Sequence, residues 1–180
     1  ASAFYFGTRW AIDEGYISGA TEYKRDMLRA ICFIEGTEIT MGDGKIKNIE
    51  NVLKGDIVKS YNLKTGKIEN KEVLLKEESS SIEFVKIEFE DGTINVNTPT
   101  HPYYVKSKGW SSFSKEEAIK KYSILVDELE EGDIVYQIKG EEIFELKIKK
   151  IFFINKEMKT YNLSNVKGNH NFFANGILVH

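Results

Sequence analysis

Alternating apolar and polar residues, interrupted by glycine-containing turns, dominate the chain after residue 32. The clearest case flanks Asp91 and Gly92, where residues on both sides alternate with a period of two. Pairs such as Asp-Gly supply the positive φ that tight hairpins need. The hairpins expected on this basis are 38–41 with 45–47, 58–62 with 68–69, and 84–89 with 93–96. Further strand-like stretches at 143–154 and 172–179 complete the prediction of a mainly β domain.

Two segments depart from this pattern. Ser114 precedes residues 115–122 and Glu117 stands three positions after it, which predicts a short helix with a capping box. Residues 21–31 fit another short amphipathic helix capped by Thr21. The stretch before them has no clear period. We therefore expect two parts, a segment 1–31 foreign to the β domain and the domain itself at 32–180.

The β region contains an internal duplication. Gly-Asp-Ile-Val occurs at 55–58 and again at 132–135. His101 and His170 are each followed, after one residue, by two aromatic residues. Because the two matches keep the same order, they favour two similar β halves related by a pseudo-twofold axis.

Composition narrows the possible functions. The chain has 180 residues, 41% hydrophobic and 29% charged, with a net charge of -3 and no basic cluster. This balance argues against nucleic acid or an anionic membrane surface as the main partner. The single Cys excludes an internal disulfide and a zinc-finger site, and no apolar run is long enough for a membrane span.

The candidate chemistry centres on Cys32, the only cysteine. A lone Cys is commonly a small buried hydrophobe, but it becomes a nucleophile when the fold brings a base or proton donor close. His101 closes the segment Thr98-Pro99-Thr100-His101, where a proline holds the chain extended. His180 is the last residue of the sequence, a position that suits a chain acting on its own ends.

These motifs resemble those of inteins. Cys-Phe-Ile-Glu-Gly-Thr begins at Cys32, Thr98-x-x-His101 lies in the middle, and His170-x-Phe-Phe-x-x-Gly-Ile-Leu-Val-His180 lies at the end. The chain is similar to a minimal intein or a bacterial intein-like domain of the Hint (hedgehog/intein) family, over residues 32–180. The resemblance implies a horseshoe-like, mainly β Hint fold with pseudo-twofold symmetry and one or two short helices.

The resemblance also implies autocatalytic protein splicing or self-cleavage, a single-turnover reaction. The Cys32 thiol would attack the carbonyl of Ile31 in an N-to-S acyl shift. His101, whose ordinary pKa near 6.5 suits proton transfer, would protonate the leaving nitrogen, and Thr98 would orient that His or stabilise the oxyanion. His170 and His180 would assist cyclisation of an Asn at position 181, one residue beyond this sequence.

Other expectations follow from the same resemblance. Asn162 occupies a position where family members often carry Asp, so we expect it to affect the coordination of the two steps. No cofactor or metal is expected, and a thiolate would be inhibited by zinc. The implied partner is the flanking host sequence in cis, acting in a monomer. A reactive thiol favours processing in a reducing compartment such as the cytoplasm.

Three alternatives remain open. A hedgehog-type autoprocessing module shares the fold and the Thr-x-x-His motif, although the ending at 175–180 is intein-like. A Cys/His hydrolase acting in trans would turn over added peptides without residues 1–31. A β-rich binding or structural module would use Cys32 only as core, so that Cys32→Ala would change stability and no chemistry.

Overall fold

The computed structural model describes residues 31–180, and this part of the chain is built almost entirely from β-strands. The first half contains β1 (Phe33–Ile34), β2 (Glu38–Thr40), β3 (Ile46–Asn48), the 3-10 helix η1 (Ile49–Asn51), β4 (Ile57–Asn62), β5 (Lys67–Phe89) and β6 (Ile94–Asn97). The second half contains β7 (Tyr103–Val105), β8 (Gly109–Ser112), α3 (Lys115–Tyr122), β9 (Asp127–Glu128), β10 (Ile134–Lys139), β11 (Glu142–Val166), β12 (Phe172–Ala174) and β13 (Ile177–Val179). The helix predicted at 21–31 lies outside the described residues, except for Ile31.

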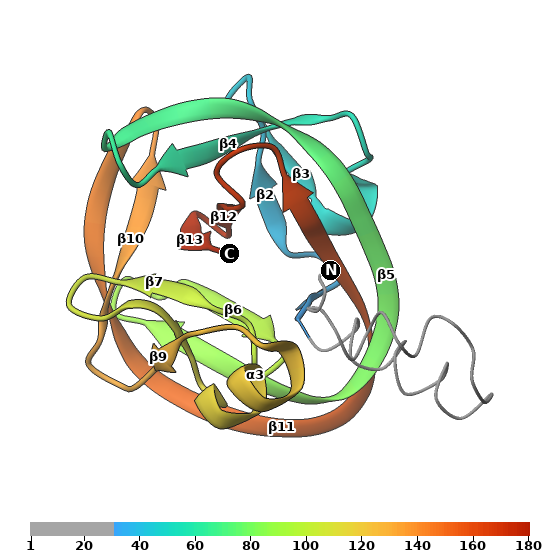
Figure 1. The fold of residues 1–180 in the computed structure, drawn as a ribbon, viewed down its shortest axis with the longest axis vertical. Coiled ribbons are helices and arrows are strands. Elements are labelled where there is room, and N and C mark those ends of the chain that lie inside the picture. The colour runs from blue at the N-terminus through green and yellow to red at the C-terminus, as the bar shows by residue number, and fades with distance from the viewer. Residues whose placement is uncertain (1–30) are drawn as a thin grey trace.

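Two very long strands frame the molecule. β5 and β11 run antiparallel from the pair Phe89 and Ile148 to the pair Val73 and Val166, with register shifts along the way. They curve around the outside as an open ring, with the C-terminal strands β12 and β13 inside it (Figure 1). The predicted mainly β, horseshoe-like Hint fold is confirmed. Each framing strand is longer than its sequence pattern indicated.

The Gly-Asp-Ile-Val repeat makes the same turn in both halves. The amide of Gly55 donates to the carbonyl of Val73, and that of Gly132 donates to the carbonyl of Ile148, both at 2.8 Å. In each turn the following Asp accepts the backbone N–H three residues earlier and the ammonium of a Lys. Each turn leads into the shorter strand of a hairpin, β4 with β5 and β10 with β11. The duplication is therefore a structural equivalence.

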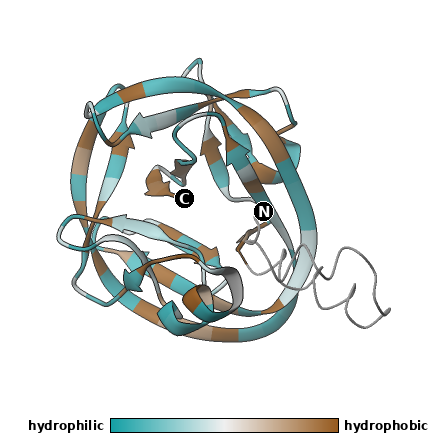
Figure 2. Cartoon of the chain, in the orientation of Figure 1, coloured by the Kyte–Doolittle hydropathy of each residue, from teal (hydrophilic) through white to brown (hydrophobic). Residues whose placement is uncertain are grey.

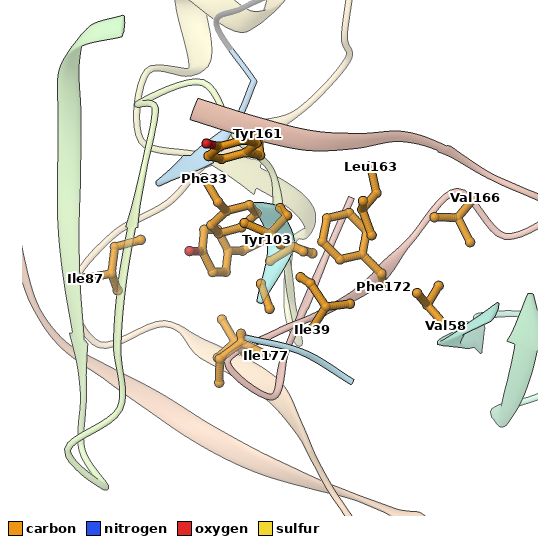
Figure 3. Packing of buried hydrophobic residues seen from close by; sticks show 14 of the residues in the cluster. Phe33, Ile39, Val58, Ile87, Tyr103, Tyr161, Leu163, Val166, Phe172 and Ile177 are labelled. Atoms are coloured by element: carbon orange, nitrogen blue, oxygen red, sulfur yellow. The ribbon is translucent and has the colours of Figure 1, made fainter. Parts of the chain in front are cut away.

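The hydrophobic core collects aromatic side chains from both ends of the domain. Phe33 from β1 lies between Tyr161 of β11 and Tyr103 of β7, with Phe172 of β12 close by (Figure 3). The rings of Phe33 and Tyr103 are 6.5 Å apart, and those of Phe33 and Phe172 are 6.2 Å apart. Apolar and polar stretches follow one another along the framing strands (Figure 2), and the buried positions are the ones that pack on the core. Residues next to Cys32 are thus fixed by packing at the centre of the molecule.

Helix α3 forms where the sequence predicts it, but its capping box is absent. Ser114 is the N-cap residue, and its side chain makes no capping hydrogen bond. Its backbone amide instead donates to the carbonyl of Pro99 at 2.8 Å. The start of the helix is therefore tied to the loop that carries Thr98 and His101. Within residues 31–180, no helix has the length and apolarity needed to span a membrane.

Candidate functional site

Cys32 lies immediately before β1 and is hydrogen-bonded to Thr98. The pairing of Phe33 with Asn97 places Thr98 opposite Cys32. The Cys32 amide donates to Thr98 Oγ1 at 2.9 Å, and the Thr98 amide donates to the Cys32 carbonyl at 2.9 Å. Cys32 is buried, whereas Ile31 before it is partly exposed. The nitrogen of the Ile31–Cys32 peptide bond is therefore held in one orientation by a side-chain hydroxyl.

Asn162 flanks Cys32 on the opposite side. β1 pairs with β11 through Phe33 with Tyr161 and Ile34 with Thr160. Continued by one residue, this register sets Asn162 beside Cys32. Asn162 is buried, and its Oδ1 accepts no hydrogen bond from any residue in 31–180. The structure thus brings this sequence-predicted position next to the thiol-bearing residue.

His101 lies next to β1. Its backbone amide donates to the Thr98 carbonyl at 3.1 Å, and its ring packs on Phe33 with centroids 4.3 Å apart. Nε2 lies 3.0 Å from the carbonyl oxygen of His180. Nδ1 is buried and makes no hydrogen bond within the described part of the chain. His101 therefore connects the neighbourhood of Cys32 with the last residue of the domain.

The electrostatic state of His101 differs from the sequence-based expectation. Burial, with a smaller contribution from His180, lowers the pKa of His101 from 6.5 to about 3. The expectation of an ordinary pKa is wrong, because an imidazolium at this depth would lose its hydration. His101 is neutral at pH 7. Since a carbonyl oxygen only accepts, Nε2 carries the proton and Nδ1 carries a lone pair.

His180 follows β13, and a backbone hydrogen bond holds it in place. Its amide donates to the carbonyl of Pro102 at 3.1 Å, and its ring meets Trp110 edge-on at 5.2 Å. The residue as a whole is exposed at the end of the chain, while its ring lies among protein atoms. This desolvation, and secondarily the charge of His170, lowers the pKa of His180 below its ordinary value.

His170 lies at the turn between β11 and β12. It has a φ of 55°, a left-handed conformation, and its amide donates to Val166 at 3.0 Å. Its side chain is exposed, in contrast to His101. The next residue, Asn171, is buried and bonds Ser60 and Tyr61 of β4. Asn171 thus anchors this turn, a role that sequence reasoning missed.

Sequence reasoning also missed a group of buried polar residues beside Thr98. Asn95 and Asn97 on β6 are fully buried, as is Tyr103. Tyr103 Oη donates to Asn97 Oδ1 at 2.5 Å, and Asn97 Nδ2 donates to the Thr98 carbonyl at 2.8 Å. The one available signal was their spacing, two residues apart in a strand, which places both on one face. Among residues 31–180, no three His, Cys, Asp or Glu side chains gather in a way that could hold a metal.

Solved structures of intein-like domains share this fold. A bacterial intein-like domain from Clostridium thermocellum is 27% identical and matches 83% of this chain and 98% of its own, with a TM-score of 0.68. A gp41-1 intein variant is 28% identical, with a TM-score of 0.63 over 83% of this chain and 98% of its own. A DnaB intein from Synechocystis, 20% identical with a TM-score of 0.69 over 83% of this chain and 96% of its own, shares the fold. The protein is a Hint-family, intein-like domain.

Sequence comparison adds a second relationship. Residues 33–140 match the family model of the AXH module, described as the Ataxin-1 and HBP1 module, and on that match the chain belongs to the AXH family. The Ataxin-1-like protein of Homo sapiens is 29% identical over 112 residues, which are 59% of this chain and 16% of that protein. HMG box-containing protein 1 of Bos taurus is 31% identical over 120 residues, 57% of this chain and 23% of that protein. The chain thus spans less than a quarter of these relatives.

The AXH match covers only part of the candidate site. It includes Thr98 and His101 but begins after Cys32 and ends before His170 and His180. In structural terms it runs from β1 to the hairpin between β10 and β11.

Proposed function

We propose that this chain is a self-processing domain, in which Cys32 rearranges the peptide bond that joins it to Ile31. The observation that carries the proposal is the hydrogen bond from the Cys32 amide to Thr98, with the neutral, buried imidazole of His101 packed on Phe33, the residue after Cys32. This arrangement singles out one peptide bond, at the boundary between segment 1–31 and domain 32–180.

In the proposed first step, the Cys32 sulfur attacks the Ile31 carbonyl carbon. A carbon–sulfur bond forms, the carbon–nitrogen bond breaks, and a thioester replaces the amide. The thiol proton passes to Nδ1 of His101 and from there to the leaving nitrogen, which becomes the amino group of Cys32. Because a protonated His101 ring, with a pKa of about 3, would not accumulate at pH 7, His101 accepts the thiol proton and passes it to the leaving nitrogen within the same step.

Thr98 and Asn162 complete the proposed N-terminal site. The Thr98 hydroxyl holds the amide nitrogen so that the bond being broken cannot turn away from its proton donor. Asn162 lies beside Cys32 as a neutral amide, where a carboxylate would help remove the thiol proton. We expect this site to work more slowly than one with Asp.

The proposed second step takes place at the C-terminal end. His180 and His170 would assist an Asn at position 181, whose side-chain nitrogen attacks its own carbonyl carbon and releases the downstream chain. The partner in both steps is the host sequence in cis, with no cofactor, in a monomer. A reactive thiol fits processing in a reducing compartment, which we take to be the cytoplasm.

The test is intact mass after incubation with excess thiol near pH 8. We expect residues 1–31 to be released as a thioester-derived product from the parent and to stay attached in Cys32→Ala. Because Cys32 is buried, the variant must also be shown to fold by its circular dichroism spectrum. Retention of residues 1–31 in both folded proteins would contradict the proposal.

One other function remains, a β-rich binding or structural module. In that case Cys32 serves only as buried core, and the Cys32→Ala variant changes stability alone. The same mass measurement separates the two functions, because a binding module releases nothing from either protein.

A further inference from the structure

A chain of hydrogen-bonded side chains, buried from Asn95 onward, joins the C-terminal strands to the candidate site. It starts at Asn175, in the turn between β12 and β13, and it passes through Asn95, Tyr103 and Asn97 to reach Thr98. Asn175 Nδ2 donates to Asn95 Oδ1 at 2.9 Å, and Asn95 Nδ2 donates to Tyr103 Oη at 3.0 Å. Tyr103 Oη donates to Asn97 Oδ1, and Asn97 Nδ2 donates to the Thr98 carbonyl.

All four hydrogen bonds of this chain point in the same direction. Each amide or hydroxyl accepts from the Asn175 side and donates toward Thr98, so the orientation of one group fixes that of the next. Tyr103 remains a donor because burial raises the pKa of its hydroxyl. The Thr98 amide continues the direction, because it donates to the Cys32 carbonyl. The network therefore ends at the residue that holds the reacting bond.

The other end of the network is attached to the C-terminal strands. Asn175 has a φ of 49°, and its Oδ1 accepts from the Glu38 amide at 2.9 Å. The backbone amide of Asn175 donates to the Glu38 carbonyl at 2.7 Å. These bonds fix the turn that leads into β13, the strand that His180 follows. The position of this turn is thus transmitted from the partly exposed Asn175 to Thr98 through the buried side chains of Asn95, Tyr103 and Asn97.

We propose that Asn95, Tyr103 and Asn97 are positioning residues for the N-terminal step: they hold Thr98 aligned on Cys32, and only when the turn before β13 is docked. This inference rests on the proposed function, since it concerns the rate of the same acyl shift. None of the three residues touches the reacting atoms. Their effect is carried by the Thr98 backbone.

The test compares Tyr103→Phe with Ser60→Ala. Each variant removes one buried hydroxyl that takes part in two hydrogen bonds, but Ser60 bonds Asn171 and lies outside the network. Release of residues 1–31 is followed against thiol concentration. At saturating thiol the rate equals that of the acyl shift, whereas at limiting thiol it reports the amide–thioester equilibrium. Misalignment of Thr98 raises the barrier and leaves the equilibrium unchanged.

We expect the saturating rate of Tyr103→Phe to fall by about tenfold or more, because small displacements of a reacting group have effects of this size. Its rate at limiting thiol should stay within about twofold of the parent, and Ser60→Ala should match the parent at both extremes. Equal slowing of the two variants, or an unchanged saturating rate in Tyr103→Phe, would overturn the inference.

Asn175→Asp is a second variant in case Tyr103→Phe does not fold. It keeps the oxygen that accepts from Glu38 and tolerates a positive φ, but it loses the amide that donates to Asn95 and to the Ile94 carbonyl. The same fall at saturating thiol supports the inference, and its absence contradicts it. If the parent itself releases nothing, the proposed function fails and the inference fails with it. A parent that cleaves beside variants of unchanged rate refutes the inference alone.

Discussion

The buried neutral imidazole of His101 makes the domain sensitive to acid. In the folded protein the pKa of His101 is about 3, whereas in the unfolded chain it returns to 6.5. Below pH 6.5 the unfolded state therefore binds a proton that the folded state does not. The stability present above pH 6.5 is lost progressively as the pH falls toward 3.

The magnitude follows from these two values. Between pH 7 and pH 5, protonation of this one imidazole in the unfolded state lowers the free energy of unfolding by about 2 kcal/mol, at about 1.4 kcal/mol for each pH unit below 6.5. At pH 5 the folded state remains unprotonated, because its pKa lies two units lower. The change of about 2 kcal/mol therefore depends on the pKa of the imidazole in the unfolded chain and on the imidazole staying neutral in the folded protein.

The assay is urea denaturation at pH 7 and pH 5, in a Cys32→Ala background that prevents processing. His101→Gln removes the titrating group while the amide nitrogen of Gln can approach the His180 carbonyl. We expect this variant to lose about 2 kcal/mol less than its parent between the two pH values. Other titrating groups contribute equally to both proteins and cancel.

His170→Gln serves as the matched control, because its imidazole is exposed in the folded protein. It keeps the His101 imidazole and should therefore lose more stability between the two pH values than His101→Gln does. If His101→Gln and its parent lose the same stability on acidification, the imidazole of His101 is not buried in its neutral form, and the proton transfer argued above is wrong.

Four further substitutions test the site and the duplication. Thr98→Val removes the hydroxyl that accepts the Cys32 amide and should slow thiol-induced release of residues 1–31 by about 10²-fold, measured by intact mass; an unchanged rate would remove Thr98 from the site. Asn162→Asp should speed the same release by about tenfold in mass time courses, since a carboxylate accepts the thiol proton; slower release would argue against this role. Gly55→Ala and Gly132→Ala should each cost about 1–3 kcal/mol in urea denaturation, because their φ values are 96° and 92°. Clearly unequal losses would contradict the equivalence of the two turns.

The two family relationships describe different extents of the same domain. The AXH match covers 33–140, whereas the intein-like structures match 83% of the chain. The part beyond residue 140 supplies most of β11 together with β12 and β13, and so Asn162, His170 and His180. The residues that would distinguish a self-processing domain from a binding module therefore lie mainly outside the AXH match.

The length of the framing strands was not evident from local patterns. Residues 68–69 and 84–89 were expected as separate strands, yet both belong to β5. Between them lie the apolar run Val73-Leu74-Leu75 and a stretch of mostly Lys, Glu and Ser residues, with no regular apolar alternation. They remain extended because they pair with β11 from the other half of the chain, through Ser79 with Thr160 and neighbouring pairs. Cross-strand pairing here outweighs weak local propensity.

β6 shows how a correct strand prediction can leave its orientation undecided. The alternation of Ile94 and Val96 with Asn95 and Asn97 predicts a strand, and an apolar face would ordinarily turn inward. In the structure Asn95 and Asn97 are buried, while Ile94 is 44% exposed. The Asn side chains are tolerated inside because each one is paired, to Tyr103, Asn175 or the Thr98 backbone.

The sequence by itself determined the β class, the turns at Gly55 and Gly132, and the candidates Cys32, Thr98 and His101, because periodicity, positive φ and reactive side chains are local properties. Only the tertiary structure decided how these groups meet. The pairing of β1 with β6 and β11 sets Thr98 and Asn162 on either side of Cys32. Burial makes His101 neutral at pH 7. These properties depend on strands distant in sequence and on the exclusion of water, which no local pattern encodes.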